Sequence, residues 1–173
     1  MYNIGDLVVY GKIGIFKIID ISTKDLSNET KEQLYYTLKS IYQDCTVYVP
    51  IQSPKVFIRP VITKQEAENL IDMIPSIQAE VYHSRVLSEL THHYEEILQK
   101  HSCADLIEMT MSLHTKKQML REQKKKFGAV DEKFMKKAED LLFGELGAAL
   151  KISKTEVPDY ISSRIKQIES QIK

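Results

Sequence analysis

The hydrophobic pattern of this chain changes period once. Between Leu7 and Val61, short runs of β-branched and aromatic residues (LVVY, IFKIIDIS, LYYTLKS, TVYVP) are separated by glycine, asparagine and aspartate breaks. Such runs are typical of β-strands. After Thr63 the apolar residues recur every three or four positions, which is the helical period. The sequence therefore predicts an α+β protein of two domains, a small N-terminal β-domain followed by an all-α helical bundle.

The four or five predicted strands are too short to be stable as isolated hairpins. We therefore expect them to curl into a small β-barrel. Pro50, Pro54 and Pro60 are expected to end the pairing, because proline has no N–H to donate to a ladder.

The predicted strand pair at residues 33–50 is rich in tyrosine. Tyr36 and Leu38 alternate with Tyr35 and Thr37, a pattern expected when one side of a strand is only partly covered. We expect some tyrosines of this pair to be exposed. Exposed tyrosine beside an open strand edge offers a protein partner both backbone hydrogen bonds and aromatic contact area. For any one of these tyrosines, packing in the core is an equally good interpretation.

Helix boundaries can be predicted in the second half. TKQE has the form of a capping box, with Thr63 as N-cap and Glu66 reaching back, and Ser102 with Asp105 resembles a second N-cap. One apolar stripe contains Leu87, Leu90, Tyr94, Ile97 and Leu98, and a later helix is expected from about Asp131 to Leu150. The expected divisions are 1–62 for the β-barrel, 63–75 for a helical connector, 76–153 for the bundle and 154–173 for a helical C-terminal tail.

Composition narrows the class of protein. The 173 residues include 24 Lys and Arg against 24 Asp and Glu, so no overall field draws the chain to nucleic acid or membrane. Cys45 and Cys103 lack any metal-ligand spacing, as is usual for free thiols in a reducing compartment. The chain contains no apolar run long enough to span a bilayer, and its first residues lack the features of a signal peptide. We expect a cytoplasmic monomer that binds no membrane.

Histidines are the few candidates for catalysis or metal binding. His92 and His93 are adjacent, so on a helix they point about 100° apart and cannot form a metal pair. His83, His101 and His114 have no acidic or cysteine companion at ligand spacing. We predict no catalytic residue, no metal and no cofactor. An enzyme with a site around His83, His92 and His101 is kept as a third hypothesis.

The strongest local charge lies in KKQMLREQKKK, residues 116–126. Six basic residues stand there against Glu122, a local net charge of +5. On a helix, Lys117, Arg121, Lys124 and Lys125 would lie along one side. Such a cluster is either a solvated helix face or a surface that binds the phosphate backbone by releasing counterions.

Three stretches, IGDLVVYGKIGIFKIIDI, YYTLKSIYQDCTVYVPI and RPVIT, follow one another along the first third of the chain. In this order they resemble the CarD family of bacterial transcription regulators. LTHHYEEILQK and DEKFMKKAEDLLFGELGAAL, with the spacing between them, are similar to the family's C-terminal bundle. The resemblance covers most of residues 2–150, and the joint order of the stretches is its specific feature.

The resemblance implies a Tudor-like or SH3-like barrel that docks by strand addition onto the β subunit of RNA polymerase. Thr23, Lys24, Asp25 and Leu26 match the partner-facing strand, and Tyr48 matches a second polymerase-binding position. Relatives typically carry a basic residue at the sites of Lys24 and Tyr48. Here Tyr48 would supply contact area in place of a salt bridge.

The resemblance also implies that the bundle touches promoter DNA beside the −10 element and alters open-complex stability. Many relatives have a tryptophan followed by arginines just before the tyrosine that Tyr94 matches, whereas this chain has Leu90, Thr91, His92 and His93 there. Leu90 is compatible with a small wedge at a base step, but a core position on the apolar stripe is the interpretation that we favour.

Four lysines complete the expected DNA-binding set. Lys133 matches a basic position that faces the DNA backbone in relatives, and Lys124, Lys125 and Lys126 end the basic run. We expect weak or non-specific contact with promoter DNA. Our leading hypothesis is a non-catalytic regulator that binds polymerase and promoter. The alternative is an adaptor that keeps the protein partner and no longer touches DNA.

Overall fold

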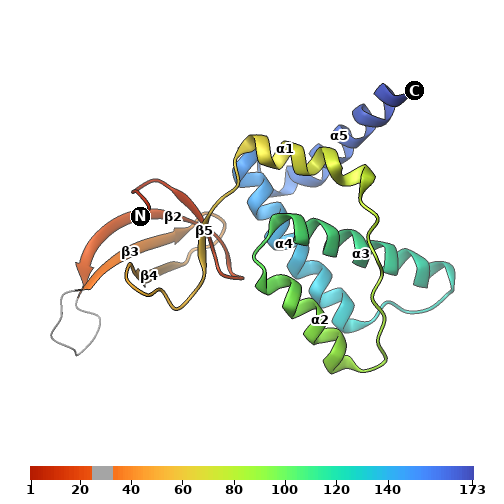
Figure 1. Ribbon diagram of the computed structural model, residues 1–173, viewed down its shortest axis with the longest axis horizontal. Helices are drawn as coiled ribbons and strands as arrows, with labels where there is room; N and C mark the ends of the chain where they lie inside the picture. Colours follow the sequence, from red (N-terminus) through yellow and green to blue (C-terminus); the bar gives the residue numbers. More distant parts are fainter. Residues whose placement is uncertain (25–32) are drawn as a thin grey trace. The chain divides into compact units, whose positions relative to one another are not determined.

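The computed structural model describes residues 1–24 and 33–173 of the chain (Figure 1). These residues form two compact units, Met1–Ile62 and Thr63–Lys173. All strands of the described residues belong to the first unit, and all helices belong to the second. The boundary between the units falls where the hydrophobic period of the sequence changes.

The first unit is an antiparallel sheet. Its strands are β1 (Leu7–Tyr10), β2 (Gly14–Lys24), β3 (Gln33–Ser40), β4 (Thr46–Pro50) and β5 (Ile58–Pro60), in the spatial order β4-β3-β2-β1-β5. The turn between β1 and β2 requires glycine at position 11, where φ is +53° and a Cβ atom would stand 2.7 Å from a methyl group of Val56.

The closed barrel expected from the sequence is not seen in the described residues. β4 and β5 lie at opposite edges of the sheet, and each pairs with one described neighbour. They contain five and three residues, and they end at Pro50 and Pro60, which have no N–H to extend a ladder. The described part of the sheet is therefore open at both edges.

One face of the sheet carries the hydrophobic core, and a β-bulge in β2 sets which side chains reach it. Ile18 pairs with Leu38 but Asp20 pairs with Thr37, so β2 has one residue more than β3 at this point. The bulge keeps Ile18 and Ile21 on the core face and puts Asp20 on the opposite face. The buried core residues of the sheet are Val8, Phe16, Ile18, Tyr36, Leu38 and Val49.

The middle of β3 is buried on both faces, whereas Lys39, on the face expected to be partly covered, is exposed. Tyr36 lies in the core, and Tyr35 and Thr37, on the other face, are also buried. β3 lies between β2 and β4, so side chains of both neighbours flank it. Of the four tyrosines at 33–50, Tyr42 and Tyr48 are the exposed ones.

The second unit is helical. Its helices are α1 (Lys64–Met73), α2 (Leu87–Gln99), α3 (Cys103–Glu122), α4 (Ala129–Leu150) and α5 (Val157–Ile172), with short 3₁₀ helices at Ile74–Ser76 and Lys154–Glu156. Both predicted N-caps are confirmed. Thr63 accepts a hydrogen bond from the Glu66 backbone while the Glu66 carboxylate accepts one from the Thr63 backbone. Ser102 accepts from the Asp105 backbone at 3.2 Å.

α2, α3 and α4 are joined by a buried polar cluster. Asp131 of α4 accepts a hydrogen bond of 2.6 Å from the Tyr94 hydroxyl of α2 and pairs with Lys116 of α3 at 2.9 Å. The Lys116 and Asp131 side chains are each only 6% exposed. Burial, followed by the hydrogen bond to Asp131, raises the pKa of Tyr94 well above its usual value. We call Tyr94, Lys116 and Asp131 the polar joint.

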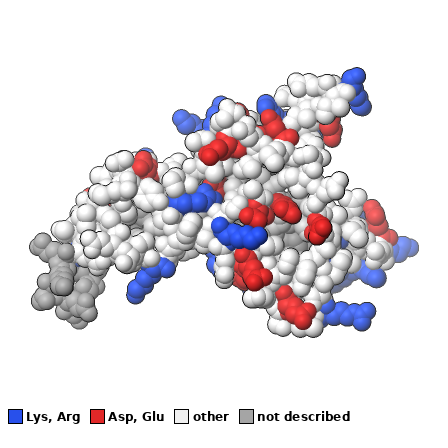
Figure 2. Space-filling model, in the orientation of Figure 1, with Lys and Arg blue, Asp and Glu red and all other residues white. Residues whose placement is uncertain are grey.

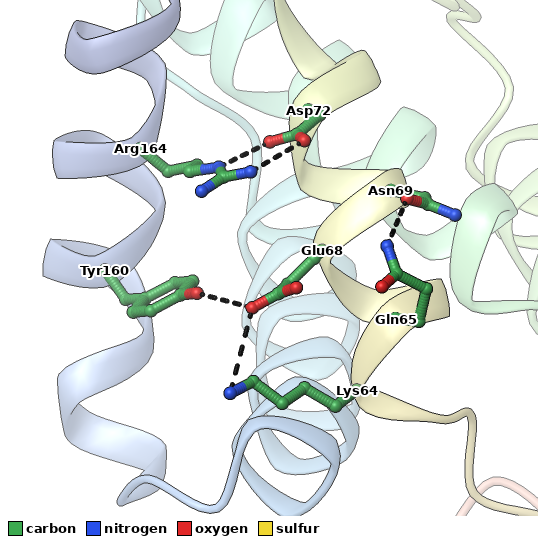
Figure 3. A network of polar contacts seen from close by, with 7 residues as sticks. All are labelled: Lys64, Gln65, Glu68, Asn69, Asp72, Tyr160 and Arg164. Atoms are coloured by element: carbon green, nitrogen blue, oxygen red, sulfur yellow. Dashed lines mark hydrogen bonds and ion pairs between the residues drawn. The ribbon is translucent and has the colours of Figure 1, made fainter.

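α1 and α5 lie side by side and are linked by polar contacts (Figure 3). Arg164 donates two hydrogen bonds to the Asp72 carboxylate, at 2.6 and 2.9 Å, and the Tyr160 hydroxyl donates to Glu68 at 3.4 Å. The hydrogen bond from Arg164 lowers the pKa of Asp72. The segment 63–75, expected as a connector, and the tail 154–173 thus pack against each other within the helical unit.

Candidate functional site

β2 is longer than β1, its neighbour on one side, and part of it has no described partner strand on that side. β1 pairs with β2 from Gly14 to Lys17, and Ile18 exchanges backbone hydrogen bonds with Gly5 and Asp6, at 2.7 and 3.0 Å. From residue 19 to residue 24, β3 is the only strand beside β2 among the residues that the structure describes. We call residues 19–24 the open segment of β2. Its outer side presents backbone groups that a further strand can pair with.

Two of the predicted polymerase-binding residues meet at this segment. The Lys24 ammonium lies 4.0 Å from the centroid of the Tyr48 ring, within the range of a cation–π contact. Tyr48 is 47% exposed, and Thr23 beside Lys24 is also exposed. Lys24 and Tyr48 come from β2 and β4, the two neighbours of β3. The contact therefore spans the width of three strands.

The predicted residues Asp25 and Leu26 lie in the range 25–32, outside the described residues. Their part in the site stays a prediction.

The face of the sheet that carries Tyr48 also carries polar side chains. Ser22 donates a hydrogen bond of 2.7 Å to Asp20, and the Tyr35 hydroxyl donates to Gln33 at 3.3 Å. The Thr37 hydroxyl is buried there without a hydrogen-bond partner among the described residues. Tyr48 lies opposite Thr37 on this face, and its ring remains exposed contact area.

A comparison with protein families identifies the domain that contains this sheet. Residues 2–62 match the family model of the CarD-like/TRCF RID domain, and this range coincides with the first compact unit. Residues 2–62 are a CarD-like RNA polymerase-interacting domain. The resemblance drawn from the sequence motifs is thereby confirmed for this part of the chain. The matched domain supports a role in transcription that involves interaction with RNA polymerase.

Outside the CarD-like domain, Leu90 does not lie where a DNA wedge would need it. Its side chain is 4% exposed and shares the inner face of α2 with Tyr94 and Leu98. In this structure Leu90 is a core residue, which corrects its place among the DNA-binding candidates. Leu87, one turn earlier on the same expected stripe, is instead 65% exposed.

The two adjacent histidines of α2 have different surroundings. His92 is exposed and pairs with Glu96 at 3.3 Å. His93 stacks on the ring of Tyr82, with centroids 3.8 Å apart and planes 11° from parallel. Burial is the main cause that lowers the pKa of His93, which favours its neutral form. His93 is therefore a poor phosphate ligand at neutral pH.

The basic run 116–126 is divided by the end of α3. Lys116 belongs to the buried polar joint, and Lys117 pairs with Glu132 at 3.5 Å. Because α3 ends at Glu122 and Lys124 has φ of +55°, the expectation of one continuous basic helix side is wrong. Lys124, Lys125 and Lys126 are exposed in the connection to α4.

Lys133 is exposed near the start of α4. The start of α4 lies beside the end of α3, so Lys133 is at the same end of this helix pair as Lys124–Lys126. These four lysines (124–126 and 133) are the basic turn. On the face of the helical unit drawn in Figure 2, Lys and Arg side chains are interspersed with Asp and Glu. The charge available for phosphate is thus local.

Residues 1–24 and 33–173 contain neither a cluster of metal-ligating side chains nor a membrane-spanning helix. No group of three His, Cys, Asp or Glu side chains there is placed to hold a metal ion. None of the helices in this part of the chain is long and apolar enough to cross a membrane.

Proposed function

We propose that this protein is a non-catalytic regulator of bacterial transcription that binds the β subunit of RNA polymerase by strand addition. In this proposal a polymerase strand pairs with the open segment of β2. The helical unit then contacts promoter DNA beside the −10 element and changes the stability of the open complex.

The open segment in a CarD-like domain is the observation that carries the proposal. Strand addition takes its affinity from backbone hydrogen bonds and its specificity from nearby side chains. Lys24 of the open segment and Tyr48 of β4 are a cation and an exposed aromatic ring in contact. They would meet an acidic or apolar side chain on the incoming strand.

Amide hydrogen exchange in the presence of purified bacterial RNA polymerase tests this docking mode. We expect the amides of residues 19–24 that point away from β3 to gain protection on binding, because they would donate hydrogen bonds to the added strand. The outer edges of β4 and β5 serve as internal controls, since both are also open in the described sheet. Protection at β4 or β5 alone, or no binding at all, would overturn the docking mode.

The DNA-binding part of the proposal is supported by the basic turn. Lysines that neutralise phosphates supply affinity without reading sequence. The contact would be weak and non-specific, because Leu90 is buried and His93 is stacked on Tyr82. The same two observations favour a second candidate, an adaptor that binds polymerase and does not touch DNA.

Footprinting of polymerase on a promoter distinguishes the two candidates. A regulator should extend or strengthen protection beside the −10 element when it is added to the polymerase–promoter complex. An adaptor should bind the complex and leave the footprint unchanged. Binding with an unchanged footprint at low salt would overturn the DNA part and leave the polymerase part standing.

A further inference from the structure

The helical unit contains a cavity of about 260 Å³ that none of the proposed contacts uses. It lies between α2, α3 and the segment 77–86, which we call the strap. The Ser112 hydroxyl of α3 donates a hydrogen bond of 2.5 Å to the Glu80 carbonyl. Tyr82 stacks on His93 of α2. The strap is therefore held to both helices, and it forms one wall of the cavity.

Part of the cavity lining is apolar. Val81 of the strap, Ile97 of α2 and Met109 of α3 contribute aliphatic and thioether surface, and Met109 is buried. Cavities that take drug-sized molecules usually measure about 300–1,000 Å³. This cavity is slightly smaller and suits one short aliphatic chain or one ring.

The lining also carries an excess of negative charge. Glu80, Asp105 and Glu108 stand against one lysine, Lys100, so the formal charge of the lining is −3 + 1 = −2 with His93 neutral. Lys100 pairs with Asp105 at 3.2 Å. Within the described part of the chain, no ion pair joins Glu80 or Glu108 to a basic side chain.

We propose that this cavity binds an organic cation, an ammonium or guanidinium group on a short aliphatic stem. The stem would lie against Val81, Ile97 and Met109, and the cationic head would sit near the carboxylates of Glu80 and Glu108. Such a ligand matches both halves of the lining, because amphipathic cations bury the stem and keep the charge at a polar edge.

Other ligand classes fit the lining less well. A phosphate or carboxylate would meet two carboxylates without a cation of their own. A divalent metal ion would need a set of ligands that the described His, Cys, Asp and Glu side chains do not form. A neutral apolar molecule would gain no attraction from the exposed carboxylates of Glu80 and Glu108.

Titration of the full chain with butylammonium, monitored by NMR at the Met109 methyl group and the His93 ring, tests the proposal. We expect both signals to shift and saturate with butylammonium. Butyrate and butanol have the same stem and serve as the anionic and neutral controls, for which we expect no saturable shift. Absence of a saturable shift with butylammonium, or equal binding of butyrate or butanol, would overturn the proposal.

Two variants locate the binding. Glu108→Gln should weaken butylammonium binding about twofold to fivefold, the effect of one exposed ion pair. Glu169→Gln, which removes an exposed carboxylate from α5, is the matched control and should leave the affinity unchanged. Ser112→Ala should also weaken binding, because it frees the strap, while the helical circular dichroism stays at the wild-type value. Equal effects of Glu108→Gln and Glu169→Gln would overturn the assignment to this cavity.

The same cation could come from a free amine or from a lysine side chain of a partner peptide. A second titration with N-acetyl-lysine amide separates these sources. Binding of the lysine amide at least as tight as that of butylammonium identifies a peptide side chain as the ligand. Binding of butylammonium alone identifies a small amine.

Discussion

The two units of the chain differ in whether their polar groups have partners within the described structure. In the CarD-like domain, the open segment of β2 leaves backbone groups without a described partner strand. In the helical unit, the polar joint removes a lysine and an aspartate from water and satisfies each with the other. Backbone groups are present whatever the side chains are, so the proposed strand addition would not depend on a basic side chain at Tyr48. A DNA surface made of side chains disappears when those side chains change or become buried.

The largest effect is expected when the polar joint is broken. Asp131→Ala leaves the Lys116 ammonium and the Tyr94 hydroxyl buried without their partner, and should lower the unfolding free energy by about 3–5 kcal/mol. Urea unfolding followed by helical circular dichroism measures this. The neighbouring variant Glu132→Ala removes only an exposed pair with Lys117 and should cost less than about 1 kcal/mol.

A compensating variant sharpens the same prediction. Lys116→Met with Asp131→Leu removes both buried charges, and should recover most of the stability that Asp131→Ala loses. If the double variant is as unstable as Asp131→Ala, the loss comes from packing and not from an unpaired charge. Polymerase binding by the folded double variant should equal that of the wild type.

The next largest effect concerns the open segment. Lys24→Glu with Tyr48→Ala should weaken polymerase binding about tenfold, which corresponds to about 1.4 kcal/mol. Fluorescence titration against purified polymerase measures it. Lys55→Glu with Phe57→Ala makes the same two kinds of change in the β4–β5 loop, where Phe57 is 48% exposed, and should leave the affinity unchanged. Equal losses in both double variants would refute our choice of surface.

A smaller effect is expected at the basic turn. Replacing Lys124–Lys126 by glutamine should reduce the salt dependence of promoter binding, by at most about 0.9 in log–log slope for each phosphate that a lysine no longer neutralises. Binding of the polymerase–promoter complex at a series of salt concentrations gives the slope. Glutamine at Lys55, Lys166 and Lys173 is the control for net charge. If both triple variants keep the wild-type slope, the basic turn is a solvated surface.

The smallest effect should come from His93. Its pKa is lowered by burial, with further lowering by Lys116 and Lys100 and an opposing effect of Glu96. The unfolded chain therefore binds more protons than the folded chain near the ordinary histidine pKa of about 6.5, so stability rises with pH there. The contribution is complete above the unfolded pKa and is lost as the pH falls through the folded one.

Urea midpoints between about pH 7.5 and pH 5 measure this dependence. His93→Phe keeps a ring against Tyr82 without a titrating group, and should flatten the pH profile of the midpoint. His92→Phe, at an exposed neighbouring position, should keep the wild-type profile. A profile that His93→Phe leaves unchanged would assign the pH dependence to another group.

The sequence predicts those features that depend on neighbours in the chain. The strands, the helices and the caps at Thr63 and Ser102 follow from local periodicity and from side-chain to backbone hydrogen bonds. The end of α3 could not be predicted in this way. Lys124–Lys126 are compatible with a helix, and no neighbouring residue indicates that Lys124 adopts a left-handed conformation.

The polar joint could not be predicted from local pattern, because its members come from three helices. The sequence groups Lys116 with the exposed lysines of its run, although it is buried by packing against α4. One feature of the sequence does indicate that Asp131 is buried. Asp131 lies three residues before Phe134 and seven before Ala138, on the same buried face of α4. An acidic residue at such a position implies a buried partner.

The β-bulge adds one residue to β2, Ile19, which the pairing with β3 does not need. Removing Ile19 would turn the ladder with β3 into a regular one, with Ile18 opposite Leu38 and the next residue opposite Thr37, as they already are. Every side chain beyond it would keep its face of the sheet, so a shortened strand should still fold. It would lose the local bend that the bulge imposes, and the backbone of the open segment would point in a different direction.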